Sequence, residues 1–201
     1  MKKCLLTSAG FENPTIKEAF LALVGKDPAQ IRALWVPTAA ADEEARAVLA
    51  ECMKDLFDAG LQAENIMVYH LEEPMPLAKL RGYDAIYFCG GSPEYLMKHI
   101  RRVRFAAPLR QFAEEGGVYV GVSAGSIVAA ANMRSGIQLA NCVLHVHCEA
   151  GTARRDSFGL MPAGSADKQP GAVDSRAGSG DYRIERRPEP GRRMDCAGCE
   201  E

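Results

Sequence analysis

The residues best suited to do chemistry lie in the run Gly121-Val122-Ser123-Ala124-Gly125. An apolar segment, 118–120, comes directly before it, and a helix-compatible segment, 126–131, follows it. Glycine two residues before and two residues after a serine lets a strand turn sharply into a helix without a clash. This turn, a nucleophile elbow, lifts the serine hydroxyl clear of the sheet. We therefore predict that Ser123 is a nucleophile, and the simpler alternative is a tight turn with an incidental serine.

The elements that must position this serine appear as short apolar segments that alternate with helical patterns. Such alternation is typical of parallel strands that crossover helices bury on both faces, so we predict an α/β fold. The five predicted strands are Lys2–Ser8, Ile31–Val36, Asn65–Leu71, Ala85–Cys89 and Val118–Val122.

The residues between these strands indicate where helices begin and end. Asn13 and Pro14 provide a cap and a first helical residue, and Gly25 provides a stop. Asp42–Ala59 is predicted to be one helix, because six side chains recur at spacings of three and four residues before Gly60. These are Val48, Leu49, Cys52, Met53, Leu56 and Phe57, and two further helices are predicted over Pro93–Arg101 and Pro108–Glu115.

Size and charge narrow the classes of partner. A chain of 201 residues suits one α/β domain. Its net charge of −2 gives no electrostatic footprint for nucleic acid or an anionic membrane, so we expect a small-molecule or peptide partner. No apolar run is long enough to span a bilayer and the start lacks a signal-peptide core, so we expect a cytoplasmic protein. Seven scattered cysteines indicate reduced thiols rather than a disulfide framework.

Three segments together resemble peptidase family S51, the dipeptidase E-like serine peptidases that include aspartyl dipeptidases and cyanophycinase-like hydrolases. They are the strand and turn Ile86–Leu96 with its Gly90-Gly91 pair, the elbow around Ser123, and the segment Gly136–His147. The resemblance covers residues 1 to about 150. It implies a class I glutamine amidotransferase-like fold, in which a mostly parallel sheet is sandwiched between helices in a flavodoxin-like three-layer arrangement.

The resemblance also implies an activity, namely serine-type hydrolysis of short peptides, Asp-X dipeptides among them, through an acyl-enzyme and without a cofactor. It is compatible with a homodimer. His147 matches the family histidine by position, and an imidazole can take the serine proton and return it to the leaving amine. His145 lies two residues earlier, would share a strand face with His147, and is the fallback base.

Backbone amides are the candidates for stabilising the oxyanion of the intermediate. One is the N–H of Ala124, and the other comes from the Gly90-Gly91 turn, with Gly91 preferred. The alternative is that the two glycines merely end a strand before the helix that begins at Pro93.

The third member of a triad is not evident. The segment 132–136 contains no acid, whereas Glu149 lies two residues past His147 and Glu94 follows the Gly90-Gly91 turn. Either carboxylate could orient the imidazole, and a dyad aided by a backbone carbonyl is a further option. The missing acid also leaves open a catalytically impaired homologue with a binding or regulatory role.

Two apparent motifs are set aside. His145-Val146-His147-Cys148 lacks a second ligand pair at a suitable spacing, so we predict no metal site there. Cys196-Ala197-Gly198-Cys199 has redox spacing but lies in a polar segment outside any predicted βαβ unit.

The composition changes near residue 150. Residues 151–201 contain eight arginines and one lysine, against eight arginines and seven lysines in the first 150 residues, and they contain few large apolar side chains. Such a segment buries too little apolar surface to offset its ordering entropy. We predict one domain over residues 1–169 and an atypical, poorly ordered tail over 170–201 that carries no catalytic group.

Overall fold

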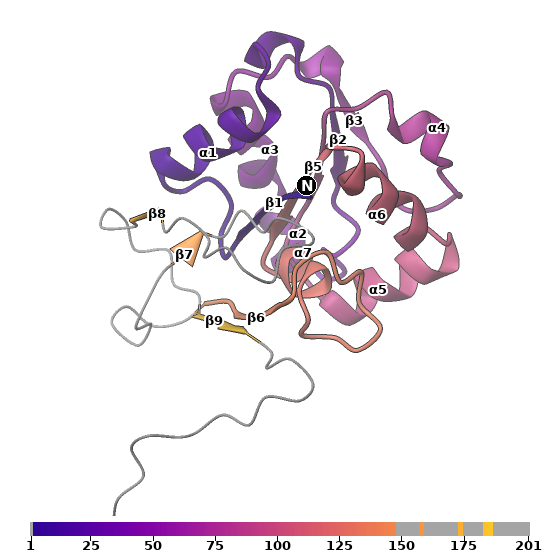
Figure 1. Ribbon diagram of the computed structural model, residues 1–201. Helices are drawn as coiled ribbons and strands as arrows, with labels where there is room; N and C mark the ends of the chain where they lie inside the picture. The colour runs from indigo at the N-terminus through magenta and orange to yellow at the C-terminus, as the bar shows by residue number, and fades with distance from the viewer. Residues whose placement is uncertain (1, 148–156, 159–172, 175–182, 187–201) are drawn as a thin grey trace, which may run out of the picture.

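The computed structural model describes residues 2–147, 157–158, 173–174 and 183–186. Its centre is a sheet of five parallel strands in the order β1-β5-β4-β2-β3 (Figure 1). The strands are β1 (Lys3–Thr7), β2 (Ala33–Val36), β3 (Ile66–Val68), β4 (Ala85–Phe88) and β5 (Val118–Val122). All five lie inside the segments that the sequence predicts, so the predicted strands are confirmed.

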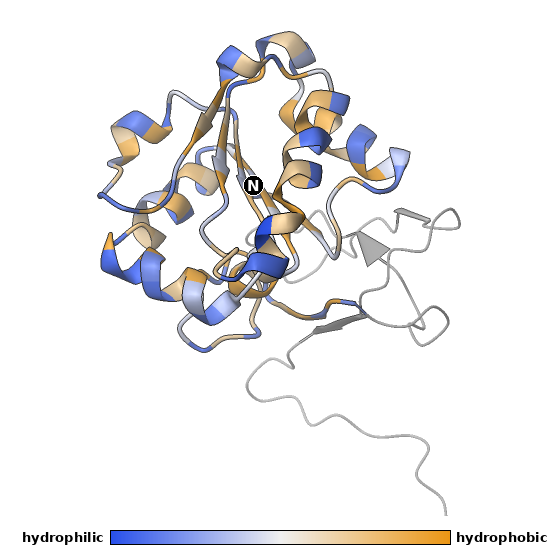
Figure 2. Ribbon diagram, turned by 180° about the vertical axis from the view of Figure 1, so that it is seen from behind, coloured by the Kyte–Doolittle hydropathy of each residue, from blue (hydrophilic) through white to orange (hydrophobic). Residues whose placement is uncertain are grey.

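The strands bury alternate side chains on opposite faces of the sheet. In β4, Ile86 and Phe88 belong to one apolar cluster, whereas Ala85 and Tyr87 belong to another. The central strands are accordingly mostly hydrophobic, and the surrounding helices carry hydrophilic segments (Figure 2). Two buried faces require two covering layers, which explains the helix–sheet–helix architecture.

The helices divide between the two faces. The cluster that contains Tyr87 includes buried side chains of α1 (Pro14–Val24) and α3 (Leu49–Asp58). The cluster that contains Phe88 includes side chains of four helices. These are α4 (Leu77–Leu80), α5 (Pro93–Arg102), α6 (Ala106–Glu114) and α7 (Ala124–Ala129), and two short 3-10 helices, η1 (Pro28–Gln30) and η2 (Ala63–Asn65), lie in the loops.

One predicted helix is wrong. The segment Asp42–Ala59 forms two helices, α2 (Glu43–Ala47) and α3, which are separated at Val48. No residue of α2 is buried, so no packing holds it in line with α3. Val48 and Phe57 are 46% exposed, so the periodic pattern overstated the buried face at both residues.

Two further pairs of strands are described after α7. Strand β6 (Cys142–His145) pairs antiparallel with β9 (Arg183–Arg186), and β7 (Ser157–Phe158) pairs with β8 (Val173–Asp174). The Asn132 side-chain amide binds Leu144 of β6 twice: its nitrogen donates to the Leu144 carbonyl at 2.6 Å, and its oxygen accepts from the Leu144 N–H at 2.9 Å. The polar Asn132 thus fixes the strand that ends just before His147.

The predicted division at residue 169 stays a prediction. The strands β8 and β9 lie within the predicted tail, and its other residues lie outside those that the structure describes.

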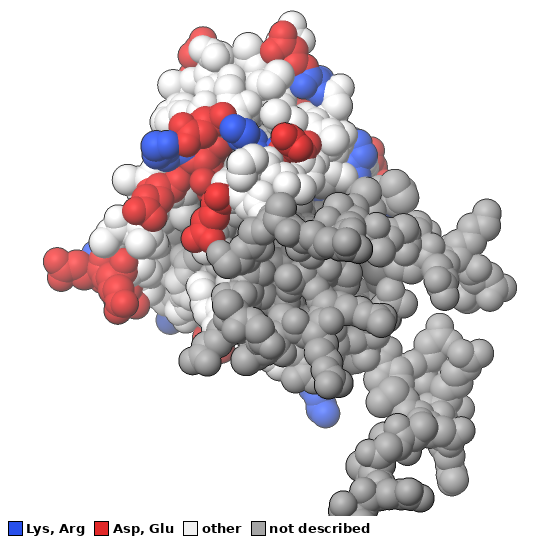
Figure 3. Space-filling view, turned by 90° about the vertical axis from the view of Figure 1, so that its left-hand side faces the viewer, with Lys and Arg blue, Asp and Glu red and all other residues white. Residues whose placement is uncertain are grey.

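Charges are dispersed on the face that Figure 3 shows. Acidic side chains gather at several places on the described part of this face, and basic side chains stand among them without forming a continuous patch. None of the helices among the described residues is both long and apolar enough to cross a membrane.

Candidate active site

Ser123 stands at the junction of β5 and α7 in a strained backbone conformation. Its φ is 46° and its ψ is −103°, a region that non-glycine residues rarely adopt. A Cβ at Gly121 would lie 2.6 Å from the backbone of Gly125, and a Cβ at Gly125 would lie 2.8 Å from Phe88. A side chain at either glycine of the elbow would clash with neighbouring atoms. Both positions therefore require glycine, as the sequence pattern predicts.

Hydrogen bonds hold this turn against the neighbouring strand β1. The Ser123 N–H donates to the Thr7 carbonyl at 2.9 Å, and the Ser126 hydroxyl lies 2.8 Å from the same oxygen. The Tyr119 hydroxyl donates to the Gly125 carbonyl at 2.7 Å. Burial raises the pKa of Tyr119 well above its usual value, so this phenol stays a neutral donor. The elbow is thereby fixed from both sides.

The imidazole of His147 faces the serine. Ser123 Oγ and His147 Nε2 are 3.0 Å apart, which is hydrogen-bond distance. His147 follows β6 with φ of 56°, so both members of the pair occupy the left-handed region of backbone conformation. Strain of this kind persists only where the surrounding structure enforces it, and it is concentrated at functional sites.

The other side of the imidazole meets Ser8, which the sequence analysis missed. Ser8 Oγ lies 3.4 Å from His147 Nδ1 and accepts a hydrogen bond from the His147 backbone N–H at 2.9 Å. A hydroxyl oxygen has two lone pairs, so it can accept from both nitrogens. A proton on Nδ1 leaves Nε2 free to accept from Ser123, which is the tautomer that a general base requires.

A sequence signal for Ser8 did exist. Thr7 and Ser8 end the first predicted strand, and the carboxyl ends of parallel strands meet at one edge of a sheet. The missing information was the strand order, since β1 and β5 are neighbours in space although they are the first and last strands of the sheet in the chain.

The Gly90-Gly91 turn lies beside the serine. A Cβ at Gly90 would be 3.4 Å from the Ser123 Cβ, and a Cβ at Gly91 would be 2.1 Å from the Ala39 carbonyl oxygen. Gly91 has φ of 134°, which favours glycine. Gly90, Gly91 and Ala124, the first residue of α7, therefore belong to the same edge of the sheet as Ser123.

The structure describes two of the other candidates named from the sequence, Glu94 and His145. Glu94 is on α5, where Ser92 Oγ lies 3.4 Å from its carboxylate, and Ser92 caps the helix. His145 is an exposed residue of β6. Glu149 lies outside the described residues. Within the described part of the chain, no group of three or more His, Cys, Asp or Glu side chains could hold a metal ion.

Comparisons with known proteins bear on the same residues. The family model for peptidase family S51 matches residues 4–143, which is more than half of the chain.

The chain belongs to peptidase family S51.

Membership of family S51 supports the assignment of this chain as a peptidase. The match includes Ser123 and the Gly90-Gly91 turn and ends four residues before His147, so the placement of this histidine rests on the geometry. The search of curated proteins finds no match.

Two solved structures resemble this S51 chain in fold. One is a putative peptidase E protein from Listeria monocytogenes EGD-e, with a TM-score of 0.53 and 23% identity over 65% of this chain and 62% of that one. The other is a peptidase from an acI-B1 Actinobacterium, with a TM-score of 0.49 and 23% identity over 64% and 57% of the two chains. The chain thus spans less than two thirds of either structure. The first likeness supports the three-layer, class I glutamine amidotransferase-like fold.

Proposed function

We propose that this chain is a serine-type hydrolase that cleaves short peptides through an acyl-enzyme. The observation that carries the proposal is the 3.0 Å contact between Ser123 Oγ and His147 Nε2 at a strained elbow. Family membership supports the peptidase class. The cytoplasmic location and the homodimer expected from the sequence stay part of this proposal.

The proposed reaction begins with proton transfer. His147 Nε2 takes the hydroxyl proton as Ser123 Oγ attacks the scissile carbonyl carbon, and the carbonyl oxygen gains a negative charge. The N–H groups of Ala124 and Gly91 are the proposed donors to that oxygen. His147 then returns the proton to the leaving amine, and water hydrolyses the acyl-enzyme by the same route in reverse.

Ser8 takes the place that an acid occupies in the Ser-His-Asp arrangement. It can hold the imidazole in the required tautomer and orientation. A neutral hydroxyl stabilises the imidazolium less than a carboxylate does, so we expect a slower enzyme than one with a complete acidic triad.

Because a neutral Ser8 stands where an acid is usual, an alternative function is also supported: a catalytically impaired homologue that binds peptides. A panel of dipeptides separates the two. We expect purified protein to hydrolyse Asp-X or neutral X-Y dipeptides, with the activity abolished by Ser123→Ala. Release of arginine from β-Asp-Arg instead would indicate a cyanophycinase-like peptidase. A folded protein without activity on any of these peptides would favour the impaired homologue.

A further inference from the structure

A pocket lies next to the candidate active site. Its volume is about 570 Å³, within the range of about 300–1,000 Å³ that small-molecule sites occupy. It is lined by the loops after β2 and β3 and by side chains of α2, α3 and α5. It therefore opens at the carboxyl edge of the sheet, where α/β proteins bind their ligands.

The pocket is separated from Ser123 by the Gly90-Gly91 turn. Gly90 packs against Ser123, and Gly91 packs against Ala39 and Ala40 on its other side. The Ser92 N–H donates to the Ala39 carbonyl at 2.9 Å, which ties the two segments together. Ala40 and Ala41 line the pocket, so a ligand there would touch the segment against which the turn rests.

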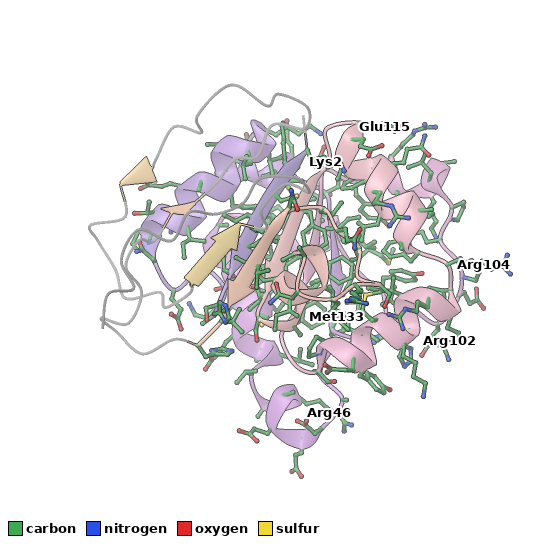
Figure 4. The ribbon with its side chains drawn as sticks, turned by 60° about the horizontal axis from the view of Figure 1, so that its bottom comes forward. Lys2, Arg46, Arg102, Arg104, Glu115 and Met133 are labelled. Carbon is green, nitrogen blue, oxygen red and sulfur yellow. The ribbon has the colours of Figure 1, made fainter. Side chains whose placement is uncertain are left out.

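The charge of the lining favours an anion. Arg46 and Arg102 line the pocket with one acid, Glu72, so the three charged side chains sum to +1. Arg46 extends from α2 and Arg102 from the end of α5, so the two cations come from different elements (Figure 4). The Arg102 guanidinium donates to the Leu71 carbonyl at 3.1 Å, which fixes its position. Guanidinium groups bind carboxylates through paired hydrogen bonds.

The lining also has an aromatic wall and unused polar atoms. The rings of Tyr95 and His99 lie 4.6 Å apart. Thr38 Oγ1 and His99 Nδ1 are buried and have no hydrogen-bond partner in the described part of the chain. Buried polar atoms are normally paired, so these two atoms lack the partners that such atoms usually have. Burial and then the charge of Arg102 lower the pKa of His99, so its ring is neutral at neutral pH.

We propose that this pocket binds an organic anion that carries a carboxylate, held by Arg102 and Arg46 against the Tyr95–His99 wall. Two sources share this chemistry. One is the acyl part of a peptide substrate that extends over the Gly90-Gly91 turn, and the other is a free organic acid. The substrate source rests on the proposed function, whereas the binding site itself does not.

Binding is tested with glutarate on the full-length Ser123→Ala protein by titration calorimetry. Because this variant lacks the Ser123 hydroxyl, the measurement reports binding alone. It therefore stays valid if the proposed function is wrong. We expect saturable binding that Arg102→Gln and Arg46→Gln each weaken at least tenfold. Arg104→Gln is the matched control, because Arg104 does not line the pocket and lies at the edge of the molecule in Figure 4. Thermal melts confirm that each variant is folded.

Kinetics on the active protein distinguishes the two sources of the anion, the peptide substrate and a free organic acid. If the substrate supplies it, Arg102→Gln lowers kcat/KM only for peptides with a carboxylate in the acyl part. If a free acid supplies it, the variant hydrolyses both kinds of peptide normally, and glutarate changes the rate of the unmodified protein alone. The proposal is overturned if glutarate does not bind, or binds folded Arg102→Gln and Arg46→Gln as tightly as Arg104→Gln.

Discussion

At the scale of single residues, the site depends on one imidazole held between two hydroxyls. Ser123 lies on the Nε2 side of His147 and Ser8 on the Nδ1 side. The elbow that carries Ser123 could be predicted from sequence because its two glycines are local. Ser8 could not be paired with His147 from sequence, because 139 residues separate the two and only the strand order brings them together.

Ser8→Ala tests the role of this hydroxyl. Without Ser8 Oγ, the backbone N–H and the ring Nδ1 of His147 each lose a partner. The ring is then no longer held in the required tautomer. We expect kcat to fall about 10- to 100-fold, since orientation of a general base is worth that order of rate. Steady-state kinetics over pH 5–9 checks this result. Ser8→Thr keeps the hydroxyl and is expected to recover most of the activity, whereas equal rates for the alanine and unmodified proteins would remove Ser8 from the mechanism.

Gly91→Ala tests the proposed role of the Gly90-Gly91 turn in stabilising the oxyanion. An added Cβ meets the Ala39 carbonyl oxygen at 2.1 Å, so the backbone must move and the Gly91 N–H moves with it. We expect kcat to fall about 100-fold or more, as for loss of one oxyanion donor. Gly116→Ala is the matched control, because Gly116 also has a positive φ, +101°, but has open space around it. Similar activity in both variants would show that Gly91 has no part in catalysis.

At the scale of elements, the sheet positions the serine and β6 positions the histidine. The buried strands could be predicted because each is a continuous apolar run that covering helices bury on both faces. The prediction of a single helix over Asp42–Ala59 was wrong, because periodicity does not reveal that α2 has no buried residue. The antiparallel pairing of β6 with β9 also lay beyond sequence analysis, since it joins segments about 40 residues apart in a stretch with a weak apolar pattern.

Asn132→Ala tests whether β6 carries His147 into place. The substitution removes both hydrogen bonds to Leu144 and leaves the Leu144 N–H without its partner. We expect a loss of about 1–3 kcal/mol in the free energy of unfolding and at least a tenfold loss of kcat. Chemical denaturation and steady-state kinetics measure the two effects. Gln138→Ala is the control, because its exposed side chain binds the Arg134 carbonyl in the same segment. Unchanged kcat in Asn132→Ala would mean that β6 does not set the position of the imidazole.

At the scale of the whole molecule, the five-stranded sheet and the described helices lie within residues 3–129, and His147 is the last described residue before the first gap. The composition of residues 170–201 predicts that they add little to this core. The pairing of β9 with β6 is a described contact by which they would affect the site.

Removal of residues 170–201 tests this prediction. Strand β6 keeps the Asn132 hydrogen bonds and the packing of Cys142 and Leu144 against Ala130 and Ala140. We therefore expect the truncated protein to fold, with a melting temperature lowered by only a few degrees, and to keep kcat/KM within about tenfold. A large loss of stability or activity would show that the segment belongs to the fold.

The most direct measurement is covalent labelling of the full-length protein with a fluorophosphonate, followed by mass spectrometry of its peptides. The account predicts one label on Ser123, absent in Ser123→Ala and slowed at least 100-fold in His147→Ala. A folded protein that takes no label, or that labels equally fast without the imidazole, would contradict it.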